Sequence, residues 1–183
     1  MSDLLLRGGR VIDPSRRVDA IQDVLLSAGR VRAVGPDLSD HPDARGAGVV
    51  ELQGLIVAPG LIDIHVHLRE PGQTAKEDIR SRTLCAARGG FTSVVCMPNT
   101  KPAIDDAAAV GLVRDRAREQ ACVRVFVAGA ITKEIAGEEL APIGALARAG
   151  VVAITDDGRC VQNGELMRRA LEYARMFDLK VMD

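Results

Sequence analysis

The feature that most constrains the fold is a regular alternation of strand-like and helix-like segments from residue 61 onward. Apolar runs typical of buried strands start at intervals of 30, 32, 28 and 28 residues, near Leu61, Phe91, Val123, Val151 and Leu179. A (β/α)8 barrel divides about 250 residues into eight units of about 31 residues, which matches this interval. A doubly wound open sheet also alternates strands and helices, so the spacing alone leaves both architectures open.

The segments between these runs carry helix-capping signals. Thr74 and Glu77 fit a capping box, and the helix that follows is expected to end near Gly89 and Gly90. Further helices are expected from a cap at Asp105 or Asp106 through Gln120, from Glu138 to Ala149, and from Leu166 to Phe177 with Asn163 as the cap. Residues 59–183 therefore predict four βα units and the start of a fifth strand.

Residues 1–58 are expected to form a separate β-rich segment. Short runs of strand-favouring residues alternate there with Gly, Pro and Asp turn signals. Residues 36–48 are polar and contain Gly and Pro, which predicts a loop. The fold expected for the whole sequence is α/β: an N-terminal β-sandwich segment, completed by strands outside this sequence, followed by the first half of a TIM-like barrel.

The composition is that of an ordinary globular protein. Of the 183 residues, 47% are apolar and 27% are charged, with a net charge of −1. Aromatic residues make up only 2% and no basic patch is evident, so no nucleic-acid partner is expected. No apolar run approaches the roughly 20 residues of a membrane span, and no secretory signal is recognisable. Four scattered cysteines indicate reduced, mostly buried thiols, and we expect a cytoplasmic protein.

Two of the three histidines lie close together in one apolar run, residues 60–68. On a strand, His65 and His67 share a face with Asp63 and Arg69, and the opposite face carries Ile62, Ile64, Val66 and Leu68, which we expect to pack. Paired histidines are more often ordinary core residues than ligands, but a shared face with a carboxylate and a guanidinium favours a metal site. Two imidazoles on one strand face can bind the same ion.

Two further polar side chains lie where a parallel β/α sheet forms its active site, at the carboxyl ends of the predicted strands. Arg69 can bind a substrate carboxylate through two parallel hydrogen bonds. The alternative is a structural ion pair with Glu70 or Glu77. Asn99 follows the strand that ends at residue 97, and it either binds a polar ligand or is a plain turn residue before Lys101-Pro102.

An acidic pair ends the fourth predicted strand. Asp156 and Asp157 precede Gly158, and either carboxylate could reach a metal ion held by the two histidines. The alternative is a simple turn, because Asp-Gly is a strong turn signal. Cys160 lies close by in the sequence and is a weaker candidate for a role in the same site.

The stretch from Ala58 to Gly72, APGLIDIHVHLREPG, resembles the signature of the amidohydrolase superfamily, and within it the bacterial dihydroorotases. Met97-Pro98-Asn99-Thr100 and Thr155-Asp156-Asp157-Gly158 are similar to two further motifs of that family, in the same order and at similar separations. Hydantoinases and allantoinases typically carry a carboxylated lysine on strand four. This sequence has Asp157 there and no nearby lysine, and its Arg69 suits a substrate with a free carboxylate.

The resemblance implies roles for five residues. His65 and His67 would ligate zinc, and Asp157 would be a bridging or shared ligand with a catalytic role, with Asp156 the lesser candidate. His67, Arg69 and Asn99 would bind the substrate. The implied reaction is the reversible cyclisation of N-carbamoyl-L-aspartate to dihydroorotate in pyrimidine (UMP) biosynthesis, with a zinc-bound hydroxide attacking the ring amide in the reverse direction. One or two zinc ions are compatible with the pattern.

The resemblance also implies residues that this sequence does not contain. Further metal-binding histidines and a catalytic aspartate would follow residue 183, so we interpret the sequence as an N-terminal half with little activity alone. The alternatives are a hydantoinase- or allantoinase-like cyclic amidase, and a non-catalytic half that pairs with another chain. The implied partners are the small-molecule substrate and, at the protein level, a second copy of the chain or aspartate transcarbamoylase.

Overall fold

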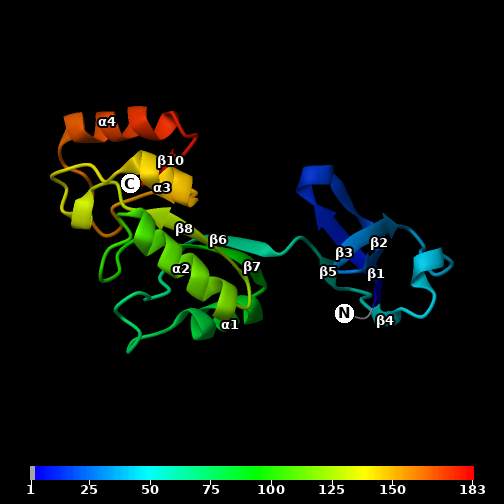
Figure 1. The fold of residues 1–183 in the computed structure, drawn as a ribbon. Helices are drawn as coiled ribbons and strands as arrows, with labels where there is room; N and C mark the ends of the chain where they lie inside the picture. Colours follow the sequence, from blue (N-terminus) through cyan, green and yellow to red (C-terminus); the bar gives the residue numbers. More distant parts are fainter. Residues whose placement is uncertain (1–2) are drawn as a thin grey trace. The chain divides into compact units, whose positions relative to one another are not determined.

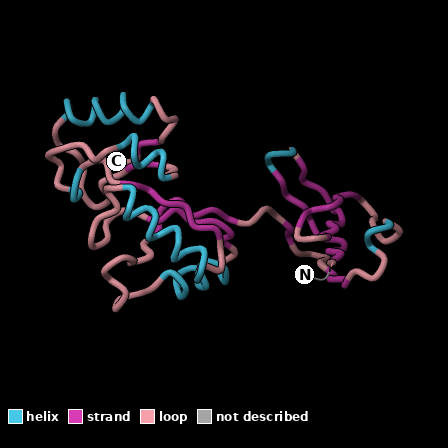
Figure 2. Tube along the Cα trace, in the orientation of Figure 1, coloured by secondary structure: helices cyan, strands magenta, loops and turns pink. Residues whose placement is uncertain are grey.

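The computed structural model describes residues 3–183, which form two compact units (Figure 1). The first unit extends to Pro59, and the second comprises Gly60–Asp183. Each unit has its own five-stranded sheet. The long helices all belong to the second unit, whereas the first consists of strands and loops with short helical turns (Figure 2).

The first unit is a single mixed sheet. Its strands are β1 (Leu4–Asp13), β2 (Val18–Ser27), β3 (Arg30–Gly35), β4 (Gly48–Glu51) and β5 (Ile56–Val57). The order is β3-β2-β1-β4, with β5 also paired to β1; β2 runs antiparallel to β1 and β3, and β4 and β5 run parallel to β1. The expected β-sandwich is not confirmed, because a sandwich needs a second sheet against the first, and residues 3–59 form only one.

Local chemistry explains the connections of this sheet. The turn between β2 and β3 has positive φ at Ala28 (50°) and Gly29 (72°), the conformation that matches the twist of two paired antiparallel strands. Asp23 is 3% exposed, and its carboxylate accepts hydrogen bonds from the backbone N–H groups of Gly8 (2.9 Å) and Leu38 (3.0 Å). A buried carboxylate therefore fixes the start of the loop over residues 36–48, which contains one short helical turn, Pro42–Ala44.

The second unit is a half-barrel of parallel strands. Its strands are β6 (Leu61–Val66), β7 (Phe91–Cys96), β8 (Arg124–Gly129), β9 (Ala153–Ile154) and β10 (Lys180–Val181). All pairs are parallel, and the order β10-β9-β8-β7-β6 follows the sequence without a reversal. A doubly wound sheet reverses its strand order at a switch point, so the sequential order favours the barrel arrangement over the open sheet.

Four helices connect these strands: α1 (Ile79–Arg88), α2 (Ala107–Gln120), α3 (Ile143–Ala149) and α4 (Gly164–Arg175). Because parallel crossovers are right-handed, a sequential strand order places successive helices on the same face of the sheet. Asp106 caps α2 and Asn163 caps α4, as the sequence predicted. The helices also pack against one another in chain order, α1 on α2, α2 on α3 and α3 on α4.

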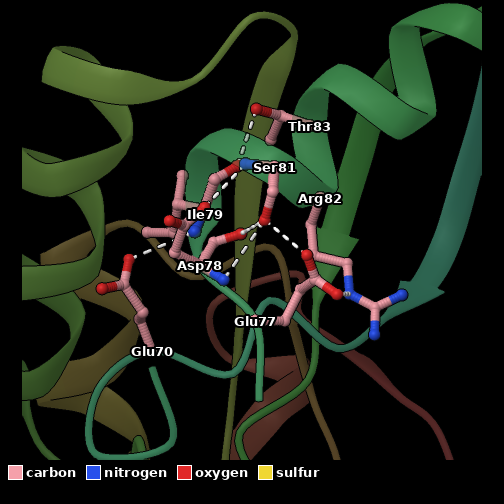
Figure 3. Close-up of polar contacts among 7 residues, drawn as sticks. All are labelled: Glu70, Glu77, Asp78, Ile79, Ser81, Arg82 and Thr83. Atoms are coloured by element: carbon pink, nitrogen blue, oxygen red, sulfur yellow. Dashed lines mark hydrogen bonds and ion pairs between the residues drawn. The ribbon is translucent and has the colours of Figure 1, made fainter. Parts of the chain in front are cut away.

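The starts of the other two helices differ from the prediction. The capping box of α1 consists of Asp78 and Ser81, four residues after the predicted one, so the prediction at Thr74 and Glu77 is wrong (Figure 3). Helix α3 begins at Ile143 and not at Glu138. An isolated antiparallel bridge between Thr132 and Leu140 holds this segment out of the helix, and this contact overrides local helix propensity.

The core of the second unit lies between the sheet and its helices. Its fully buried members come from both layers and include Ile79, Ile104, Val110, Val113, Val127, Ile131, Ile143, Leu146 and Ile154. No helix in the described residues has the length and apolar character needed to cross a membrane.

Two expectations about burial are corrected. Ile62 and Ile64 were expected to pack, but their exposed fractions are 64% and 62%, because β6 is the edge strand of its sheet. Of the four free cysteines only Cys96 is buried, and the others are exposed, so the expectation of mostly buried thiols is wrong. Burial raises the pKa of the Cys96 thiol to about 12.

Candidate metal centre

The candidate ligands meet at the carboxyl ends of the parallel strands. His65 lies on β6 and His67 immediately follows it, Asn99 follows β7, and Asp157 follows β9. In the sequence, one βα unit separates β6 from β7 and two separate β7 from β9, but the carboxyl ends of these strands lie at the same edge of the sheet. Residues 32 and 58 positions apart therefore reach hydrogen-bonding distance there.

Three side chains converge closely enough to bind one ion. The Nε2 atom of His65 lies 3.0 Å from Oδ1 of Asp157, and Nε2 of His67 lies 3.6 Å from Oδ2. One ligand atom from each of the three residues lies within 4.8 Å of the others. Two ligands bonded at about 2.1 Å to a tetrahedral zinc ion lie roughly 3.4 Å apart, so the two histidine–aspartate separations suit a shared metal ion.

The donor set also fits zinc chemically. Two neutral imidazoles and one carboxylate resemble the sets of three protein ligands that hold catalytic zinc and leave a fourth position for water or substrate. The His65 side chain is 54% exposed and that of His67 is 30% exposed, so an ion held there would remain accessible from the mouth of the half-barrel. Within residues 3–183 no other three His, Cys, Asp or Glu side chains come together as closely.

Asn99 connects two of the three ligands. Its Nδ2 atom donates to Oδ2 of Asp157 at 2.5 Å, because a carboxylate only accepts. Its Oδ1 atom therefore faces Nδ1 of His67 at 3.0 Å, and that ring nitrogen must carry the proton. The proton on Nδ1 leaves the lone pair on Nε2, the atom that points at the metal position. The sequence identified Asn99 as a substrate-binding candidate but not this bridging contact.

The acidic pair divides into one residue inside the centre and one outside it. Asp156 is 2% exposed and accepts hydrogen bonds from the N–H groups of Ile131 (2.8 Å) and Thr132 (3.0 Å) and from the Thr132 hydroxyl. These contacts attach the end of β9 to the loop after β8. Asp157 alone faces the histidines. Cys160 is exposed and lines a small pocket of about 220 Å³ beside Asp157.

Arg69 lines a larger pocket next to the histidines. This pocket has a volume of about 500 Å³ and is also lined by Asp63, His65, His67 and Arg82. Among the described residues Arg69 forms no ion pair: Glu70 pairs with Arg116. Glu77 pairs with Arg82, as Figure 3 shows. Glu70 and Glu77, the two carboxylates that could have paired with Arg69, are therefore paired with other arginines. The Arg69 guanidinium is available to a ligand.

Two residues near the centre were missed by sequence reasoning. The Nε2 atom of Gln73 donates to the backbone oxygen of Asn99 at 3.2 Å, and no sequence pattern marks that residue. Glu70 is 4% exposed, and the signal that could have identified it is a charged residue directly after the histidine motif. Both lie in the loop that follows β6.

Comparisons with known proteins agree with this arrangement. The sequence profile described as dihydro-orotase-like matches residues 54–183, more than half of the chain. The chain belongs to the dihydro-orotase-like family. Dihydroorotase from Geotalea daltonii is 51% identical over 180 residues, which cover 98% of this chain and 42% of that protein. Dihydroorotase from Solibacter usitatus is 52% identical over 179 residues, covering 98% and 41%. The chain thus spans about two fifths of the length of these dihydroorotases.

Solved structures show the same fold. L-hydantoinase (dihydropyrimidinase) from Arthrobacter aurescens has a TM-score of 0.78 at 18% identity, covering 99% of this chain and 40% of that one. Dihydropyrimidinase from Brevibacillus agri has a TM-score of 0.76 at 23% identity, covering 98% and 39%. The mixed α/β architecture with a parallel half-barrel is therefore confirmed, as is the expected likeness to dihydroorotases at the level of sequence.

Proposed function

We propose that this chain provides the metal-ligating and carboxylate-binding part of a dihydroorotase. The proposed reaction is the reversible cyclisation of N-carbamoyl-L-aspartate to dihydroorotate. The observation that carries the proposal is the convergence of His65, His67 and Asp157 beside an arginine without an ion pair. Sequence identity of about 50% to dihydroorotases over almost the whole chain supports the same reaction.

In this proposal each residue has a physical task. His65, His67 and Asp157 hold the ion, and Asn99 keeps the His67 proton on Nδ1 so that Nε2 can coordinate. Zinc bound there would supply an activated water at neutral pH and polarise the amide carbonyl. The Arg69 guanidinium binds the substrate carboxylate and sets the ring amide against the metal position. The number of ions, a second protein partner and the cytoplasmic location stay predictions.

The competing proposal is a hydantoinase-like cyclic amidase, and the fold similarity to hydantoinases supports it. Hydantoin and dihydrouracil lack the carboxylate of dihydroorotate, so the two proposals differ in what Arg69 binds. Two features favour dihydroorotate: the absence of an ion pair at Arg69 within residues 3–183, and the identity of the sequence relatives.

Steady-state kinetics of the zinc-loaded protein expressed from its native gene tests the proposal. We expect turnover of dihydroorotate and little turnover of dihydrouracil. Arg69→Met should raise KM for dihydroorotate by about 10- to 100-fold, because a charge-assisted hydrogen-bonded pair is lost. Arg80→Met removes an exposed arginine of α1 and serves as the matched control, with kinetics unchanged. Equal turnover of dihydrouracil, or an Arg69→Met variant with unchanged KM, would contradict the proposal.

A further inference from the structure

A half-buried ion pair anchors the loop that carries His67 and Arg69. Glu70 is 4% exposed, and its Oε1 atom lies 2.8 Å from Nη1 of Arg116 on α2. Its other oxygen, Oε2, accepts the backbone N–H of Ile79 at 3.2 Å, at the start of α1 (Figure 3). One carboxylate thus connects the loop after β6 to two helices, although neither it nor Arg116 belongs to the metal centre.

The loop that Glu70 anchors is also fastened to the loop that carries Asn99. The N–H of Lys101 donates to the carbonyl of Pro71 at 3.2 Å. Gly72 has φ of +79°, and a Cβ atom there would lie 1.8 Å from the Lys101 carbonyl oxygen, so only glycine allows this approach. Together with the hydrogen bond from Gln73 to the Asn99 carbonyl, these contacts make the two loops one assembly.

Arg69 itself is held in an unfavourable backbone conformation. Its φ is +65°, in the left-handed region that residues with a Cβ atom rarely adopt. A residue stays in that region only when its surroundings fix it. Two contacts fix this conformation on the C-terminal side of Arg69. One is the hydrogen bond from the N–H of Gln73 to the Arg69 carbonyl (3.0 Å), and the other is the anchoring of the buried Glu70 side chain.

Besides anchoring the loop, Arg116 neutralises the charge of Glu70, the carboxylate next to Arg69 in the chain. Glu70 is adjacent to Arg69 in the chain, and it is the nearest carboxylate in sequence to that guanidinium. Because Arg116 and Ile79 occupy both Glu70 oxygens, the carboxylate is satisfied away from the pocket. Without Arg116, a buried and unpaired Glu70 would attract another cation, and Arg69 is its neighbour in the chain.

We propose that Arg116 and Glu70 are positioning residues, and that Arg116 keeps Glu70 from pairing with Arg69 so that this guanidinium stays free for the substrate carboxylate. The inference rests on the proposed function, because it concerns the binding of a carboxylate-bearing substrate at the same site. Both residues act through Arg69, and they leave the metal ligands unaffected.

The test is a double-mutant cycle in the zinc-loaded protein expressed from its native gene, with KM, kcat, zinc content and Tm measured for each variant. We expect Arg116→Met to raise KM for dihydroorotate by at least about tenfold, with kcat changed less than about threefold and zinc content unchanged. The double variant Glu70→Gln/Arg116→Met should recover most of the lost affinity, because the competing charge is gone. A merely structural pair would instead lower kcat, zinc content and Tm together with the affinity, and the effect would not be confined to KM.

Two controls keep the outcome interpretable. Arg116→Lys retains a cation beside Glu70, so its KM should stay within about threefold of the wild type. If Arg116→Met fails to fold, Arg116→Gln replaces it with the same expected rise in KM, because it removes the charge but keeps a polar side chain. Arg168→Met breaks an exposed ion pair with Glu172 on α4 and should leave KM unchanged. A folded Arg116→Met protein with wild-type KM would overturn this inference alone. A wild-type protein that does not turn over dihydroorotate would overturn the proposed function as well.

Discussion

Asp156 and Asp157 are adjacent in the chain but face different surroundings. Asp156 is buried and accepts three hydrogen bonds, two from backbone N–H groups and one from the Thr132 hydroxyl. Asp157 points to the histidines from the opposite side of the strand end. The sequence could place both residues at the mouth of the sheet, but it could not choose between them with certainty because the donors to Asp156 lie 24 and 25 residues away.

This division predicts opposite phenotypes for the two aspartates. Asp156→Ala should lower the free energy of unfolding by about 3 kcal/mol, because the three donors of a buried, charge-assisted network lose their acceptor. Asp157→Ala should change the unfolding free energy by less than about 1 kcal/mol. It should, however, abolish zinc binding. Urea denaturation and zinc analysis of the two purified variants measure both effects. Normal zinc content in Asp157→Ala would remove this residue from the centre.

Asn99 gives a second prediction at the scale of single residues. Asn99→Ala leaves Nδ1 of His67 without its acceptor and Oδ2 of Asp157 without its donor. Loss of such an outer partner typically weakens metal affinity by about 10- to 100-fold, and we expect a decrease of that size in zinc affinity measured by competition with a chelator. Gln162→Ala, an exposed amide that contacts only the Cys160 carbonyl, is the control. Unchanged zinc affinity in Asn99→Ala would mean that Asn99 does not orient the ligands.

The pairing of Glu70 with Arg116 shows where residue-level prediction stops. The two residues are 46 positions apart, and α2 also carries Arg114 and Arg118, so no local pattern identifies the partner. His65 and His67 were predictable because alternate positions of a strand share a face whatever lies around them. Contacts within one element follow from the sequence, whereas contacts between elements depend on packing.

At the scale of elements, helix starts were predictable where a capping side chain alone decides them. Asp106 and Asn163 bond the first free N–H groups of α2 and α4. The start of α1 was misplaced because Thr74 and Glu77 also fit a capping pattern. The loop they lie in is instead held by contacts to a different loop, including the hydrogen bond from Gln73 to Asn99.

Helix α4 offers the clearest test of a cap. Asn163 accepts from the N–H groups of Glu165 (3.0 Å) and Leu166 (3.2 Å). Asn163→Ala should therefore lower the free energy of unfolding by about 1 kcal/mol, whereas Asn163→Asp should retain the stability because aspartate caps equally well. Thermal or urea unfolding measures the difference. Equal stability of the alanine and aspartate variants would show that the cap does not contribute.

At the scale of the whole molecule, the interval of about 31 residues per unit indicated the half-barrel, and the sequential strand order supports it. The exposure of side chains on its edge strand, β6, could not be predicted from this interval. An apolar strand face is expected to be buried, but Ile62 and Ile64 are exposed because β6 has a neighbour on one side only. Whether an apolar side chain of β6 is buried depends on the elements packed around it within residues 3–183, and the sequence of the strand does not specify them.

The last prediction concerns the activity of the 183-residue chain by itself. Its candidate centre has three ligands, and Asp157 is the one carboxylate among them. Asp157 contacts both histidines and Asn99, so this carboxylate is not free to act as a proton donor. The chain spans about two fifths of the length of its dihydroorotase relatives, and we predict that the general acid/base is not among these 183 residues. General acid–base catalysis is worth roughly 10²- to 10⁴-fold, so we expect a kcat/KM for dihydroorotate at least about a hundredfold below that of the full-length Geotalea daltonii dihydroorotase assayed in parallel.

Measuring zinc binding by the isolated chain distinguishes two causes of low activity: a folded site that lacks a catalytic group, and a site that does not fold. The isolated chain should bind at most one zinc ion, and His65→Ala should abolish that binding while Arg80→Met leaves it intact. Turnover comparable to that of the full-length relative would contradict the prediction, because it would mean that these residues complete the catalytic machinery unaided. Zinc binding without turnover would locate the missing contribution in proton transfer, since the proposed ligands and the arginine proposed to bind the carboxylate are present in the chain.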